Sequence, residues 1–99
     1  AGFDAHRMDP LLDMQVSADS FYRIGKLIGE TFDNVFATLE GGYSVMDLYK
    51  GVLNLTAGIN GEPMPIVEKE TDSAILVWDA YEMNKNMVLS NLSKYWTIS

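Results

Sequence analysis

The segment VFATLEGGY, residues 35–43, decides the fold class that the sequence predicts. Its first five residues are mostly apolar and rich in strand formers, and turn residues bound the run on both sides. A short run of this kind is typical of a buried strand in a parallel sheet. We therefore expect a strand over residues 35–39, with a loop at its carboxyl end that contains Gly41, Gly42 and Tyr43.

A helix is expected directly before this strand. Ser17 is a good N-cap, and Asp19 lies in the first turn, where the helix dipole favours a carboxylate. Apolar residues then recur at helical spacing, namely Phe21, Ile24, Leu27, Ile28 and Phe32. The helix should end near residues 33–34, and this order of helix and strand favours an α/β fold with a parallel sheet.

A second helix is expected after the strand. Ser44 should cap it, with Asp47 three residues on in a near capping-box arrangement, and Asn60-Gly61 should end it. One face of this helix is apolar and consists of Val45, Leu48, Tyr49, Val52, Leu55 and Ile59. These residues should pack against the rest of the domain.

A third, long helix should follow an extended connection that contains Pro63 and Pro65. This helix should begin at residue 71 or 72 and end near Trp96. Its apolar residues form a broad band made of Leu76, Val77, Trp78, Ala80, Tyr81, Met83, Met87, Val88, Leu92 and Tyr95. A band of this breadth predicts burial against more than one neighbour.

Length and composition restrict the possible functions. With 99 residues the chain is one small domain or a piece of a larger one. A net charge of -7 argues against binding to nucleic acid or to anionic membranes, and the absence of cysteine excludes thiolate metal sites. No apolar run approaches the roughly 20 residues that span a bilayer. We expect a cytoplasmic protein, and because Ala1 is not an initiator Met, we expect an upstream segment to have been removed.

Two polar residues lie where strands of a parallel sheet would end, and ligands gather at that edge of such sheets. Asp4 could bind a cation, and the Tyr43 phenol could donate a hydrogen bond to an oxygen that gains negative charge. An Asp after a strand is also common in turns, and Gly-Gly-Tyr is a frequent turn sequence. One carboxylate and one phenol alone provide neither a complete metal site nor a general base.

The motifs Gly2-Phe3-Asp4-Ala5-His6 with Asp9-Pro10-Leu11, and Leu39-Glu40-Gly41-Gly42-Tyr43, resemble the C-terminal third of the histone deacetylase superfamily. The resemblance is in particular to bacterial and archaeal members of the acetoin-utilisation and acetylpolyamine-amidohydrolase types. The resemblance implies part of an arginase-deacetylase type α/β fold, mostly helical in this piece with one or two strands. Residues 1–65 would form active-site loops and a helix-strand-helix unit, and residues 66–99 the terminal helix.

The resemblance also implies roles for the motif residues. Asp4 would bind the catalytic zinc, and Tyr43 would polarise the acetyl carbonyl of the substrate. Gly41 and Gly42 would let the backbone approach the substrate. The Glu-Gly-Gly-Tyr loop favours deacetylation over the chemistry of arginase-type metallohydrolases, which share the sheet.

Three further residues are candidates for shaping the site, each with two interpretations. His6 is expected near the site without binding zinc or acting as general base, and it is either structural or orients Asp4. Asp9 either shapes its loop through a turn or forms part of the wall of the site. Glu40 either orients its loop by accepting backbone hydrogen bonds or is simply solvated.

The departures from the family pattern limit what this chain does by itself. Its only histidine is His6, so the paired histidines and the Asp-x-His zinc ligands of the family are not in these residues. We expect part of a zinc deacetylase that acts on acetyl-lysine, acetylpolyamines or small acyl amides, inactive in isolation. It should self-associate or associate with the missing N-terminal part. The alternative is a non-catalytic helical interaction module that retains the motifs as relics.

Overall fold

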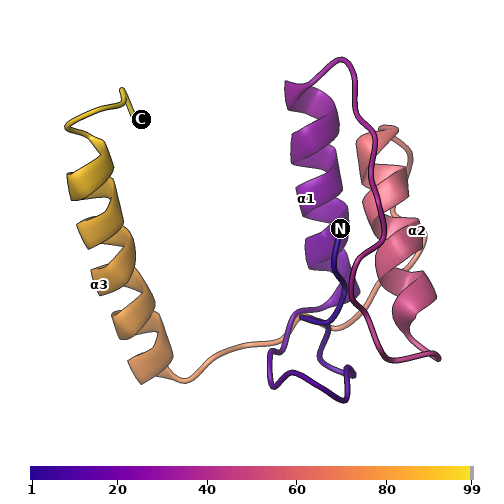
Figure 1. The fold of residues 1–99 in the computed structure, drawn as a ribbon. Helices are drawn as coiled ribbons and strands as arrows, with labels where there is room; N and C mark the ends of the chain where they lie inside the picture. Colours follow the sequence, from indigo (N-terminus) through magenta and orange to yellow (C-terminus); the bar gives the residue numbers. More distant parts are fainter. Residues whose placement is uncertain (99) are drawn as a thin grey trace.

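The computed structural model describes residues 1–98, and these residues form three helices and no β-strand (Figure 1). The helices are α1 (Ala18–Thr31), α2 (Leu48–Ile59) and α3 (Ile75–Leu92). Helices α1 and α2 lie side by side, and α3 stands apart from them at the end of an extended segment. The predominance of helix agrees with the prediction, whereas the expected parallel sheet is absent from the described residues.

The predicted strand over residues 35–39 does not form. The chain here has one backbone partner, the N-terminal segment, where the Glu40 N–H donates to the Ala1 carbonyl at 2.9 Å. A regular parallel ladder would bring the Phe3 N–H to the Glu40 carbonyl, but it binds the Gly41 carbonyl at 3.1 Å. The hydrogen-bond register between the two segments therefore shifts by one residue after a single pair of residues. The pairing is too short to form a strand.

Glycines allow α1 and α2 to pack closely. An ideal Cβ on Gly25 would lie 2.3 Å from the Leu55 carbonyl oxygen, and one on Gly29 would lie 2.2 Å from the Ile59 carbonyl oxygen. On the other helix, a Cβ on Gly58 would collide in the same way with the backbone of α1. These three positions have no room for a side chain, so the contact between the helices is backbone against backbone.

The hydrophobic core is small and centres on Phe3, Phe21 and Leu55. The rings of Phe3 and Phe21 lie 5.1 Å apart between centroids, and the Phe3 ring occupies the space that Gly51 leaves free on α2. Of the apolar stripe expected on α1, only Phe21 is buried. Phe3 thus fixes the N-terminal motif against both helices.

Two predicted helix ends agree with the structure. Ser17 is the N-cap of α1, although its side chain makes no capping hydrogen bond, and α1 ends two residues before the predicted position. Gly61 ends α2 with φ 70°, and the Glu62 N–H donates to the Ala57 carbonyl at 2.9 Å. This hydrogen bond belongs to the Schellman arrangement in which glycine is favoured.

The predicted start of α2 is wrong by three residues, since the N-cap is Asp47 rather than Ser44. The Ser44 hydroxyl donates to the Asp47 carboxylate at 2.7 Å, so it does not cap the backbone N–H groups of the helix. Residues 45–47 form a turn, and α2 begins at Leu48. Val45, expected on the apolar face, is consequently 89% exposed.

The extended segment after α2 is attached to the helices through Asn54, which is fully buried. Its side-chain amide donates to the Ala18 carbonyl at 2.9 Å and to the Ile66 carbonyl at 2.8 Å. The Asn54 Oδ1 atom accepts the Ile66 N–H at 3.0 Å. A single side chain therefore satisfies both backbone groups of Ile66 and joins this segment to α1 and α2.

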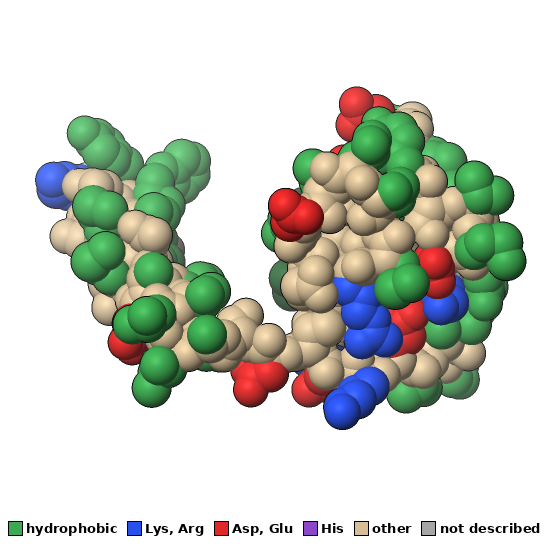
Figure 2. All heavy atoms as spheres, turned by 90° about the horizontal axis from the view of Figure 1, so that it is seen from below, with side chains coloured by type: hydrophobic (Ala, Val, Ile, Leu, Met, Phe, Trp, Pro, Cys, Tyr) green, Lys and Arg blue, Asp and Glu red, His purple; other side chains and the backbone are tan. Residues whose placement is uncertain are grey.

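Helix α3 is shorter than predicted and none of its residues is buried. It begins at Ile75 rather than at residue 71 or 72, and it ends four residues before Trp96. Its largest side chains contact each other, with the Trp78 ring edge-on to Tyr81 at 5.9 Å between centroids. Figure 2 shows hydrophobic side chains over the visible face of α3, at the left of the view. The expected burial against several neighbours does not occur within residues 1–98.

Among the described residues, no helix combines the length and the apolar character needed to cross a membrane.

Candidate functional site

The two sequence motifs lie together in the structure. The Phe3 N–H donates to the Gly41 carbonyl at 3.1 Å, which joins the loop of Asp4 to the loop of Tyr43. A second link runs from the Tyr43 N–H to the Asp9 Oδ2 atom at 2.7 Å. The candidate zinc ligand and the candidate oxyanion donor therefore belong to adjoining loops, held together on both sides.

Asp4 is half-buried, and glycines surround its carboxylate. An ideal Cβ on Gly41 would lie 3.3 Å from both carboxylate oxygens of Asp4, and one on Gly2 would lie 3.1 Å from Oδ1. Gly41 also has φ 88°, a conformation that side chains other than glycine rarely adopt. Two local features therefore favour glycine at position 41, namely its positive φ and its close contact with the Asp4 carboxylate.

Tyr43 follows Gly42, which has φ 121°. Its side chain remains open, since the residue is 53% exposed, while its backbone is held by Asp9. The phenol can therefore meet a ligand that arrives from outside the described residues. Glu40 is exposed, and only its backbone takes part in joining the two loops.

Asp9 is buried and binds two backbone N–H groups. Its Oδ1 atom accepts the Leu11 N–H at 2.8 Å, the turn expected for an Asp before Pro10, and its Oδ2 atom accepts the Tyr43 N–H. Burial alone would raise the pKa of Asp9, but the N–H groups of Tyr43 and Leu11 outweigh it and hold the pKa below its ordinary value. Asp9 is thus a buried carboxylate whose charge fixes the Tyr43 backbone, a contact the sequence did not predict.

His6 is buried, and both of its ring nitrogens have partners. The Nδ1 atom accepts the Met8 N–H at 3.2 Å, so the ring proton must be on Nε2, which donates to Glu68 at 3.0 Å. No nitrogen remains to bind a metal, to orient Asp4 or to abstract a proton. Within the described residues, His6 therefore contacts Met8 and Glu68 through its ring nitrogens.

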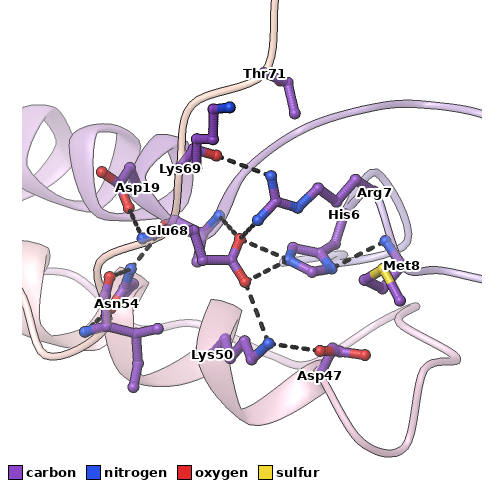
Figure 3. A network of polar contacts seen from close by, with 12 residues as sticks. His6, Arg7, Met8, Asp19, Asp47, Lys50, Asn54, Glu68, Lys69 and Thr71 are labelled. Carbon is purple, nitrogen blue, oxygen red and sulfur yellow. Dashed lines mark hydrogen bonds and ion pairs between the residues drawn. The ribbon is translucent and has the colours of Figure 1, made fainter.

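Glu68 is the residue of this region that the sequence did not single out (Figure 3). Its side chain is 7% exposed, and it accepts the Ala18 N–H at 2.9 Å in addition to the His6 ring N–H. The Glu68 carboxylate also forms ion pairs with Lys50 at 3.3 Å and with Arg7 at 3.6 Å. Residue 68 lies in a connection expected to be merely extended, so no periodicity or motif marked it.

The pKa of Glu68 reflects these contacts. Burial raises it, but the Ala18 N–H, the His6 ring and Lys50 together lower it below its ordinary value. Glu68 is therefore charged at neutral pH, although its side chain is almost completely enclosed.

Within residues 1–98, no three His, Cys, Asp or Glu side chains converge in the way a metal site requires. Asp4 is available as one ligand, whereas catalytic zinc sites have three protein ligands and an open position.

Comparison with known proteins supports the resemblance. Residues 1–59 match the histone deacetylase domain family. Over 62 residues the chain is 42% identical to a probable deacetylase of Methanothermobacter thermautotrophicus, covering 63% of this chain and 19% of that protein. Over 68 residues it is 34% identical to the chloroplastic histone deacetylase 10 of Oryza sativa subsp. japonica, covering 64% of this chain and 15% of that protein. No solved structure matches.

The family match covers more than half of the chain, and both motifs fall within it. The chain belongs to the histone deacetylase family, as the motifs predicted. It spans about a fifth or less of the length of these curated relatives.

Proposed function

We propose that this chain supplies a zinc ligand, Asp4, and an oxyanion-stabilising residue, Tyr43, to a zinc-dependent deacetylase. The observation that carries the proposal is the junction of the two loops. The carboxylate of Asp4 lies against Gly41, two residues before Tyr43, and the Phe3 N–H binds the Gly41 carbonyl. A metal ligand and a hydrogen-bond donor for the substrate must be neighbours in such an enzyme, and these two residues are on adjoining loops.

Asp4 fits the role of one zinc ligand, because a carboxylate oxygen is a normal zinc donor and this one is only half-buried. The other ligands would come from residues outside this chain. When bound, the zinc ion would supply Lewis-acid chemistry toward water and the acetyl carbonyl. The general base would also come from elsewhere, because the only histidine, His6, has both ring nitrogens engaged.

Tyr43 would donate a hydrogen bond from its phenol to the carbonyl oxygen of the substrate as that oxygen gains negative charge. Loss of one such donor costs on the order of 3 kcal/mol of transition-state stabilisation in well-studied hydrolases. The Asp9 carboxylate would keep the Tyr43 backbone in place, and Gly42 would allow the loop conformation, with φ 121°. Tyr43 thus acts on the substrate, and Asp9 acts only through Tyr43.

The substrates we propose are acetyl amides, either acetyl-lysine, acetylpolyamines or small acyl amides. The chain alone would be inactive, because one ligand and one donor do not make a complete site. We propose a cytoplasmic location and no binding to nucleic acid, the latter because the net charge of -7 repels phosphate backbones.

The test is deacetylation of an acetyl-lysine peptide by the protein made from the complete reading frame that contains these residues. Tyr43→Phe should lower kcat by roughly 100-fold to 1,000-fold. Tyr49→Phe is the matched control, because Tyr49 is exposed to a similar degree on α2 and should leave kcat unchanged. Full activity in Tyr43→Phe would refute the proposed role.

A second candidate function is a helical interaction module without catalysis. Helix α3 favours it, because this helix has no buried residue within the described chain although much of it is apolar. Surfaces of this kind usually contact another protein. The two candidates are compatible in one protein, and the activity assay decides whether the catalytic one holds.

A further inference from the structure

Three separate segments of the chain contact the carboxylate of Glu68 (Figure 3). It contacts His6 and Arg7 from the N-terminal motif, Ala18 at the start of α1, and Lys50 on α2. These partners include a ring N–H, a backbone N–H and two cationic side chains, so the charge of Glu68 is compensated on several sides. A buried carboxylate with this many partners fixes the segments that supply them.

The contacts of Glu68 lead directly to the candidate site. His6 follows Asp4 by two residues, and its Nδ1 atom accepts the Met8 N–H at 3.2 Å. The next residue, Asp9, holds the Tyr43 N–H at 2.7 Å. The loop from Asp4 to Asp9 is therefore attached to Glu68 in its middle and to Tyr43 at its end.

Glu68 is also attached to α1. The Ala18 N–H donates to its Oε2 atom at 2.9 Å, and its own N–H donates to the Asp19 Oδ1 atom at 2.9 Å. Ser17, at the N-cap position, makes no side-chain capping bond, so Glu68 takes over the capping of α1 from a distant part of the sequence. This reciprocal pair gives Glu68 a fixed position relative to the helix.

We propose that Glu68 is a positioning residue, which holds the loop of Asp4 against α1 and, through Asp9, sets the position of Tyr43. The importance of that position rests on the proposed function, whereas the coupling of Glu68 to the two loops does not. Glu68 lies beyond residues 1–59, the part that matches the family domain.

Amide hydrogen exchange followed by NMR on the 99-residue chain tests the coupling. In Glu68→Gln, one carboxylate oxygen becomes an NH₂ group, which cannot accept the hydrogen bonds that the two oxygens now receive. Exchange should rise by about tenfold at the Met8 and Tyr43 amides, because the loop that holds their acceptors, His6 and Asp9, loses its attachment to Glu68. Amides in the middle of α1 and α2 should change by less than about twofold.

Glu70→Gln is the matched control. Glu70 pairs with Arg23, but both side chains are more than 60% exposed, and the pair does not contact the motif loops. Exposed ion pairs contribute little to stability. This variant should therefore leave the exchange of Met8 and Tyr43 at the wild-type rate.

The ¹⁵N shifts of the His6 ring provide a readout that general loosening would not produce. In the wild-type chain they should report a proton fixed on Nε2, because Nδ1 accepts the Met8 N–H. In Glu68→Gln they should move toward a mixture of the two tautomers, because the acceptor for Nε2–H is weakened. Unchanged His6 shifts in that variant would overturn the proposal.

Two exchange results would also overturn it. One is a uniform rise over α1 and α2, which would mean that Glu68 only supports global stability. The other is a rise at Met8 with none at Tyr43, which would mean that the coupling stops short of the second loop. If Glu68→Gln does not fold, Glu68→Asp replaces it and should give a smaller rise at both amides, and no rise at either refutes the coupling. Since exchange requires neither zinc nor substrate, its outcome is independent of whether the protein is a deacetylase.

Discussion

The backbone N–H of Tyr43 donates a 2.7 Å hydrogen bond to the Oδ2 atom of Asp9, across 34 positions of sequence. Asp9 is buried and also binds the Leu11 N–H, so its carboxylate has a defined orientation. The contact connects the two motifs that identify the family. It gives a physical reason for an Asp five residues after Asp4, independent of any direct role in catalysis.

Replacement of Asp9 by Asn should free the Tyr43 loop. The Asn side chain has one acceptor oxygen in place of two, so its NH₂ group must face either the Tyr43 N–H or the Leu11 N–H. We expect exchange of one of these amides to rise by at least about tenfold, as for the loss of a hydrogen bond to a charged group. Asp13→Asn, at an exposed position nearby, is the control. If the Tyr43 and Leu11 amides exchange at the same rates in Asp9→Asn as in Asp13→Asn, Asp9 does not hold the Tyr43 loop.

Substitution of Gly58 by Ala should separate α1 from α2. The added Cβ would lie 2.3 Å from the Tyr22 carbonyl oxygen and 2.7 Å from the Lys26 nitrogen, and backbone atoms cannot rotate away. Overpacking of this kind lowers the free energy of unfolding by about 1–3 kcal/mol, which exceeds the gain in helix propensity. Urea denaturation measures the change. The control is Gly61→Asn, since Gly61 has open space around it and φ 70°, which Asn tolerates. A Gly58→Ala chain as stable as the wild type would contradict the close packing.

Acid should destabilise the fold through three carboxylates. The pKa of Glu68 and that of Asp9 are lowered despite burial by their hydrogen bonds, and the pKa of Asp47 is lowered by Lys50 and then by Ser44. A lowered folded-state pKa contributes stability above the ordinary value, which is 4.5 for Glu68 and 3.8 for the two Asp residues. That contribution is lost as the pH falls through the lowered values.

The melting temperature, followed by circular dichroism, should therefore fall between about pH 5 and pH 3. Glu68→Gln should show a shallower dependence on pH over the same range, because one of the contributing groups is gone. A melting temperature that stays constant or rises on acidification would contradict the assignment.

Helix α3 should cause the isolated chain to associate. It contains 18 residues and none of them is buried, so its apolar side chains face solvent in a monomer. Sedimentation analysis should show mass increasing with concentration. Replacing the exposed Leu76 and Met83 by Glu should shift the chain toward monomer, whereas Asn84→Asp adds a charge without removing an apolar group. A wild-type chain that is monomeric at every concentration would rule out self-association through α3.

Local signals in the sequence predicted local structure well. Ser17 and Gly61 marked helix ends correctly, because an N-cap residue and a glycine with positive φ act on the few residues beside them. The two motifs predicted the family for the same reason, since each is a short, specific pattern. Asp9 before Pro10 predicted a turn, and the turn is present.

Features that depend on distant partners were not predictable in this way. The strand over residues 35–39 was expected from composition, but a strand needs regular hydrogen bonds from neighbours, and the described chain offers only one short partner. Glu68 has no local pattern, since its partners lie 50 or more residues away at His6 and Ala18. The spacing of Gly25 and Gly29, one helical turn apart, is a local feature of the sequence that fits the close contact between the helices.

The measurement that tests the central claim most directly is zinc content together with deacetylase activity in three versions of the protein encoded by the complete reading frame. These are the wild type, Asp4→Ala and Tyr43→Phe. The account predicts about one zinc per chain in the wild type and in Tyr43→Phe, with activity only in the wild type, and loss of both zinc and activity in Asp4→Ala. Equal loss of zinc in the two variants, or activity that survives in either, would contradict the roles of Asp4 and Tyr43.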